Sequence, residues 1–131
     1  MKVLLRWCRF NLVGAAGTVV QLTALAAFNR LAPSHYLLAS VAAIEVTLLH
    51  NFVFHLHYTW RDRCTSAAIP GQLIRFHLSN GLVSIGGNLL LMPLLVERAG
   101  LPLLPSNGIA IVCCSLINFL LANRWAFPAA L

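Results

Sequence analysis

The chain has 131 residues, of which 60% are hydrophobic and only 9% are charged, and its mean hydropathy is +0.82. Soluble domains usually carry about a quarter charged residues, so this composition excludes an ordinary soluble domain and predicts an integral membrane protein. The formal net charge of +6 does not indicate nucleic-acid binding, because the basic residues stand at the ends of apolar runs instead of forming a basic face.

Four long runs of the chain carry no charged residue, apart from Glu45 in the second run. They comprise residues 10–29, 31–60, 76–96 and 99–123. A bilayer core of about 30 Å needs about 20 apolar residues in a helix, so each run is long enough for one crossing and too short for two. We therefore predict an all-α integral membrane protein, with four transmembrane helices near residues 11–31, 36–55, 77–96 and 104–123.

The basic residues predict how these helices are oriented. With four crossings, both ends of the chain and its middle loop share one side of the membrane. That side holds most of the basic residues, which are Lys2, Arg6, Arg9, Arg61, Arg63, Arg75 and Arg124. The opposite side holds only Arg30 and Arg98. By the positive-inside rule, both termini are expected in the cytoplasm.

Two segments of the chain resemble each other, "LLHNFVFHLHYTW" at residues 48–60 and "SLINFLLANRWAF" at residues 115–127. Arg-Phe pairs at residues 9–10 and 75–76 open the two halves. We predict one transmembrane domain over residues 1–131, built from two parallel-oriented helical hairpin repeats at about 9–60 and 75–127. The rival interpretation of the first run is a cleaved signal peptide. The repeat favours retention of that run, because it makes the first helix the counterpart of the third.

The motifs "RFNLVGAAGTVVQ", "NFVFHLHYTW" and "NFLLANRWAF" resemble the GtrA family of small four-span membrane proteins, over about residues 9–127. The resemblance implies a role in cell-surface polysaccharide synthesis. It implies translocation, or flipping, of a polyprenyl-phosphate-linked monosaccharide across the bacterial cytoplasmic membrane. His55, His57 and Tyr58 depart from the family pattern, which tends to have Asn, Arg and an aromatic residue there. Gln21 stands where the family often has an acidic or amide residue.

Arginines and aromatic residues gather at the predicted inner surface. Guanidinium groups at this depth either anchor the protein in the headgroup region or grip a phosphate in a bidentate way. The candidates for phosphate binding are Arg9, Arg75 and Arg124. Aromatic side chains at this depth are typical of an interfacial belt. The expected anchors are Trp60, Trp125 and Phe127.

Amide side chains lie inside or at the ends of the predicted spans. Asn51 and Asn118 recur at the same place in both halves, either as helix clamps or as ligand contacts. Gln21, Asn80 and Asn88 lie on polar helix faces. These faces serve either close helix packing or a groove that binds sugar hydroxyls.

Glu45 is the only acidic residue inside a predicted span. It lies near the bilayer centre, where a charged carboxylate is costly, so we expect it to be protonated or partnered. A role in the transport path and a purely structural hydrogen bond are both open interpretations.

The sequence contains no pattern that is typical of an enzyme or a metal site. The His-x-His pair at residues 55–57 lacks further ligands at a recognised spacing, and the four cysteines form no disulfide framework. No nucleophile–base arrangement, phosphate-binding loop or carboxylate pair is present. We therefore expect no catalytic residues, no cofactor and no metal.

The expected partners are membrane lipids, the polyprenyl-phosphate sugar lipid and a membrane glycosyltransferase. A homo-oligomer is expected, because four helices enclose little volume. Two other functions remain open. One is a small proton-coupled multidrug exporter that uses Glu45, and the other is a membrane scaffold for a glycosyltransferase.

Overall fold

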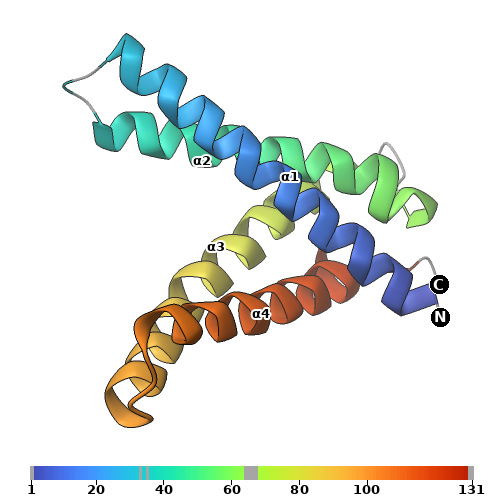
Figure 1. The fold of residues 1–131 in the computed structure, drawn as a ribbon. Coiled ribbons are helices and arrows are strands. Elements are labelled where there is room, and N and C mark those ends of the chain that lie inside the picture. Colours follow the sequence, from blue (N-terminus) through green and yellow to red (C-terminus); the bar gives the residue numbers. More distant parts are fainter. Residues whose placement is uncertain (1, 33, 35, 64–67, 130–131) are drawn as a thin grey trace. The chain divides into compact units, whose positions relative to one another are not determined.

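The computed structural model describes residues 2–32, 34, 36–63 and 68–129, which are helical apart from short connections (Figure 1). The chain divides into two compact units, residues 1–62 and residues 63–131, called unit 1 and unit 2 below. Each unit is a hairpin of two long helices.

Unit 1 consists of α1 (Lys2–Leu31) and α2 (Tyr36–Phe54), which run alongside each other in Figure 1. α2 continues into a π-helical turn, η1 (His55–Thr59), which also packs against α1. A short 3-10 turn, η2 (Arg61–Arg63), follows at the boundary between the units.

Unit 2 pairs α3 (Ile69–Pro93) with α4 (Leu103–Leu121). α3 continues into the π-helical turn η4 (Leu94–Arg98), and α4 into the π-helical turn η5 (Ala122–Ala126). The chain leaves η4 through Gly100, whose φ of 65° lies in the left-handed region that favours glycine.

Arg63, the first residue of unit 2, forms hydrogen bonds with the end of η5. Its Nη1 donates hydrogen bonds to the main-chain oxygens of Asn123 at 2.8 Å and Phe127 at 2.9 Å. A further bond of 3.1 Å runs from Nη1 to Asn123 Oδ1. These carbonyls lie at the end of a helix, where the last carbonyls often accept hydrogen bonds from side chains, and the guanidinium supplies such donors.

The four predicted transmembrane helices are confirmed in type and number. Among the residues that the structure describes, the helices long and apolar enough to cross a membrane are Val3–Leu31, Leu38–Thr59, Ile69–Arg98 and Pro105–Ala126. Two predicted starts are wrong, because α1 begins at Lys2 instead of 11 and α3 begins at Ile69 instead of 77. The predictions stopped at arginines, but arginine is a good helix former whose long side chain carries its charge to the interface.

Both units end in a π-helical turn that is closed by a hydrogen bond of 2.8 Å. In unit 1 the Trp60 N–H donates to His55 O, and in unit 2 the Phe127 N–H donates to Ala122 O. These two turns are 67 residues apart, as are the Asn-Phe pairs that precede them. The predicted repeat, and the parallel orientation of its two halves, stay predictions.

Small residues let the two helices of each hairpin approach closely, as is typical of helix packing in membranes. In unit 1, a Cβ atom added at Gly17 on α1 would overlap the Asn51 side chain on α2. In unit 2, a Cβ atom at Gly87 on α3 would overlap the Cys114 Sγ atom on α4. Asn51 therefore lies at the contact between α1 and α2, where the helix-clamp interpretation placed it.

We expect Gly17→Ala to destabilise unit 1 by about 1–3 kcal/mol, because the added methyl group forces the Asn51 amide out of its place. Gly14→Ala is the matched control, since a Cβ atom at Gly14 meets nothing within 4 Å. The measurement is the melting temperature of the purified protein in detergent. The double variant Gly17→Ala/Asn51→Ala should lose less stability than the two single losses added together, and strict additivity would contradict the contact.

Candidate functional site

A buried aromatic cluster joins the start of α1 to the end of α2 in unit 1. The Phe10 ring stacks on the His55 ring, with centroids 4.9 Å apart and an interplanar angle of 9°. The Trp60 ring meets both edge-on, at 5.9 Å from Phe10 and 5.1 Å from His55. His55 Nδ1 lies 3.0 Å from Thr59 Oγ1, so the imidazole also has a hydrogen-bond partner within the turn. The cluster holds η1 against α1.

The π-helical turn explains how Trp60 reaches this cluster. In an ideal α-helix, a residue five positions later lies about 140° around the helix axis. The i→i+5 bond from Trp60 N–H to His55 O widens the turn and places Trp60 over His55. In unit 2, η5 likewise directs Phe127 inward, and its ring lies 6.2 Å from that of Phe76.

The interfacial role predicted for Trp60 and Phe127 is therefore wrong, because both side chains are 0% exposed. The prediction rested on the depth of these residues in the membrane, which does not tell whether a side chain points toward lipid or into the protein. Trp125, the third expected anchor, is 41% exposed, and its role stays a prediction.

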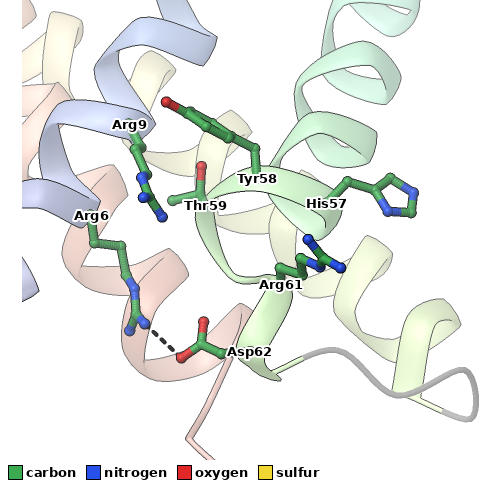
Figure 2. A pocket seen from close by; sticks show the side chains of 7 residues that line it. All are labelled: Arg6, Arg9, His57, Tyr58, Thr59, Arg61 and Asp62. Atoms are coloured by element: carbon green, nitrogen blue, oxygen red, sulfur yellow. Dashed lines mark hydrogen bonds and ion pairs between the residues drawn. The ribbon is translucent and has the colours of Figure 1, made fainter.

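A basic pocket opens at the same end of unit 1 (Figure 2). Its volume is about 610 Å³. The lining residues come from the start of α1 and from η1 and η2, and they are Arg6, Arg9, His57, Tyr58, Thr59, Arg61 and Asp62. Figure 2 shows Arg6 and Arg9 reaching from α1 toward the η1–η2 segment.

Two of the arginines are held in place by partners. Arg6 Nη2 donates to Asp62 Oδ2 at 2.7 Å, and the two side chains are 20% and 61% exposed. The Arg9 guanidinium carbon lies 5.1 Å from the centroid of the Tyr58 ring, a cation–π contact. Because the Arg6–Asp62 pair is exposed, it contributes at most about 1 kcal/mol to stability.

The charge of this basic pocket suits a phosphate. Three guanidinium groups accompany a single carboxylate, and planar guanidinium groups bind phosphate oxygens through paired hydrogen bonds. The pocket lies at one end of two helices that are long enough to cross a membrane. A phosphate bound there would therefore lie at headgroup depth.

An apolar groove adjoins the basic pocket. Its volume is about 370 Å³, and it is lined by Leu12, Val13, Ala16, Phe54, His57 and Tyr58. His57 and Tyr58 line both the groove and the pocket. Unit 1 thus offers a cationic site that continues along the helices into an apolar one.

Of the residues predicted to bind substrate, four lie in unit 1, and only Arg9 lines the basic pocket. Asn51 packs on Gly17, with its Oδ1 3.1 Å from His50 Nδ1. Gln21 is half-buried on α1, and Glu45 is exposed at the middle of α2.

Among the side chains that the structure describes, no hydrogen bond joins the unit 2 residues predicted to bind substrate to one another. Arg75 Nη1 donates to Trp125 O at 3.4 Å, and Arg124 is exposed. Asn80 Nδ2 donates to Phe76 O within its own helix, at 3.0 Å.

Asn118 is 9% exposed, and its Oδ1 has no hydrogen-bond partner within the part of the chain that the structure describes. The side chain of Asn88 lies outside the described part. The binding roles of all these unit 2 residues stay predictions.

Sequence reasoning missed most of the basic pocket. The residues it did not select are Arg6, His57, Tyr58, Thr59, Arg61 and Asp62. A usable signal was present, because Arg61 and Asp62 directly follow the aromatic motif and Arg6 lies one helical turn before Arg9.

No group of three histidine, cysteine, aspartate or glutamate side chains that could hold a metal ion is found among the described residues.

A family model for the GtrA/DPMS transmembrane domain matches residues 9–127 of this chain. The comparison with curated proteins gave no match. The matched range covers both units and includes the aromatic cluster, the groove and most of the residues that line the basic pocket.

We expect Trp60→Ala to destabilise the protein by about 3–5 kcal/mol, because it leaves a cavity in the aromatic cluster. Trp125→Ala should cost less than about 1 kcal/mol, because that side chain is 41% exposed. Thermal unfolding in detergent compares the two variants. Equal losses of stability would show that Trp60 is no more important to the interior than an exposed tryptophan.

We expect Asp62→Asn to strengthen phosphate binding several-fold, because it removes a repulsion of about 1 kcal/mol and releases Arg6. The measurement is titration of the detergent-solubilised protein with geranyl phosphate, and the gain should shrink at high salt. Glu97→Gln is the control, since it neutralises an exposed carboxylate that does not line the pocket. Weaker binding by Asp62→Asn would mean that the carboxylate helps to build the site.

Proposed function

Since the chain belongs to the GtrA/DPMS transmembrane-domain family, a domain of membrane proteins in glycolipid and polysaccharide synthesis, we propose that it flips a polyprenyl-phosphate-linked monosaccharide across the bacterial cytoplasmic membrane. The observation that carries this proposal is the basic pocket of unit 1 and its continuation into the apolar groove. That arrangement matches a ligand with an anionic head and an apolar tail.

The phosphate would enter the basic pocket from the cytoplasmic leaflet. Arg9 and Arg61 would bind its oxygens, and Arg6 would join them by exchanging the Asp62 carboxylate for the phosphate. Most basic residues of the chain fall on the same predicted side of the membrane as the pocket. This excess supports a cytoplasmic position for the pocket and for both termini.

The sugar would need polar partners on its way across the membrane. Moving a hydroxyl group from water into hydrocarbon without a hydrogen bond costs about 2–7 kcal/mol, so the several hydroxyls of a monosaccharide cross bare lipid extremely slowly. Gln21, Glu45 and Asn51 would accept or donate these hydrogen bonds along unit 1. A further pocket of about 380 Å³ near the other end of the hairpin contains Asn29 and Ser40, which would receive the sugar there.

Unit 2 would contribute contacts of its own. Its basic residues Arg75 and Arg124 would attract the lipid phosphate, and Asn80, Asn88 and Asn118 would offer hydrogen bonds to the sugar. A homo-oligomer would enclose this route better than one chain, and a membrane glycosyltransferase would supply the lipid-linked sugar. No catalytic step is proposed for this chain.

Removal of one guanidinium tests the proposed function. In proteoliposomes that contain a labelled short-chain prenyl-phosphate sugar, Arg9→Gln should lower the rate of leaflet exchange about tenfold, the loss expected for one charge-assisted hydrogen bond. Arg30→Gln is the matched control, because Arg30 is exposed at the opposite end of α1. It should leave the rate unchanged.

Other outcomes of this assay would favour other functions. Equal exchange with and without protein would contradict flipping, and retained lipid binding in that case would favour the scaffold function. If Glu45→Gln abolished resistance to cationic drugs without affecting polysaccharide, the exporter function would be favoured instead. An unchanged rate in Arg9→Gln, with flipping intact, would show that the basic pocket is not the entry site.

A further inference from the structure

We propose that the apolar groove of unit 1 holds the first two or three isoprene units of the lipid whose phosphate occupies the basic pocket. The class of ligand rests on the proposed function, but the position of the tail does not require transport. The groove lies between α1, which supplies Leu12, Val13 and Ala16, and the end of α2, which supplies Phe54.

Two shared residues place the tail next to the phosphate. His57 and Tyr58 line both the basic pocket and the groove, so one ligand can extend from the pocket directly into the groove. The Arg9 guanidinium lies 5.1 Å from the Tyr58 ring, which fixes this junction. A ligand whose phosphate is joined directly to an apolar chain fits this junction. A prenyl phosphate has that structure, whereas a phospholipid places glycerol and a second chain at the junction.

The size of the groove sets how much of the tail it can hold. A water-sized group occupies about 30 Å³, so a groove of about 370 Å³ holds on the order of a dozen non-hydrogen atoms. That number corresponds to two or three five-carbon units. The remaining tail would lie among the membrane lipids.

The groove would select by shape and not by hydrophobicity. A tail gains almost no hydrophobic free energy when it moves from lipid to protein, because lipid chains are as apolar as leucine side chains. The selectivity must therefore come from how well the tail packs against the groove. The aromatic residues Phe54 and Tyr58 line the groove, and the small Ala16 side chain leaves room for the methyl branches of an isoprenoid.

Photo-crosslinking locates the tail without any transport step. The probe is a prenyl monophosphate with a diazirine on its second isoprene unit, added to the wild-type protein in phosphatidylglycerol-containing nanodiscs and mapped by mass spectrometry. We expect labelled residues at 12–16 and 54–58. Excess unlabelled prenyl phosphate should remove the label, whereas the same excess of a straight-chain alkyl phosphate should not.

Two tryptophan variants separate the groove from its surroundings. Ala16→Trp fills the groove and should reduce labelling about tenfold, the effect of a steric cost of the size seen for overpacking. Ala15→Trp is the matched control, because Ala15 is exposed on the same turn but does not line the groove. If Ala16→Trp does not fold, the wild-type labelling pattern and its competition still decide.

Label spread over other exposed faces, or equal competition by the straight-chain phosphate, would overturn the proposal, since either result means ordinary lipid contact. Failure of leaflet exchange with groove labelling intact would leave the tail site standing and reject only the proposed function. Leaflet exchange without groove labelling would reject the tail site and leave the proposed function standing.

Discussion

The stack of Phe10 on His55 is the contact on which the basic pocket of unit 1 depends. It fixes the first turns of α1 against η1, and the residues that line the basic pocket come from these two elements and the adjoining η2. An aromatic pair contributes about 0.5–1.5 kcal/mol beyond its buried area, and Trp60 adds two further ring contacts. The exposed Arg6–Asp62 pair contributes less than this cluster. The cluster therefore positions the arginines, and the ion pair adjusts the charge they present.

The second helix of each unit ends in the same way, but the residues around the two ends differ in charge and polarity. Each second helix widens into a π-helical turn that directs an aromatic residue inward, and such turns are frequent at functional sites. In unit 1 the buried positions of the turn are His55, Leu56 and Thr59, whereas in unit 2 they are Ala122 and Ala126. Arg61 and Asp62 follow Trp60, but Pro128 and Ala129 follow Phe127. Arg9 of the basic pocket has a counterpart in Arg75, but Arg61 and Asp62 have none in unit 2.

The number and type of helices could be predicted from the sequence, because hydrocarbon tolerates few charges and the charge-free runs have the length of one crossing. Helix starts at Lys2 and Ile69 could not be found in this way, since a charge ends an apolar run without ending a helix. Burial of Trp60 was missed because the prediction rested on membrane depth alone, whereas a π-helical turn directs this ring into the interior of unit 1. The Arg6–Asp62 pair was missed because its members lie 56 residues apart, and no local pattern connects them.

Arg63 has a consequence for how the protein is made. Its guanidinium binds the main-chain oxygen of Phe127, 64 residues later in the chain. A ribosome adds about 5–20 residues each second, so several seconds pass between synthesis of this arginine and of its acceptor. During that interval the arginine has no Phe127 carbonyl to bind. Both members of the Arg6–Asp62 ion pair have been synthesised by residue 62. The helices of unit 1 can therefore pack together while the ribosome is still synthesising unit 2.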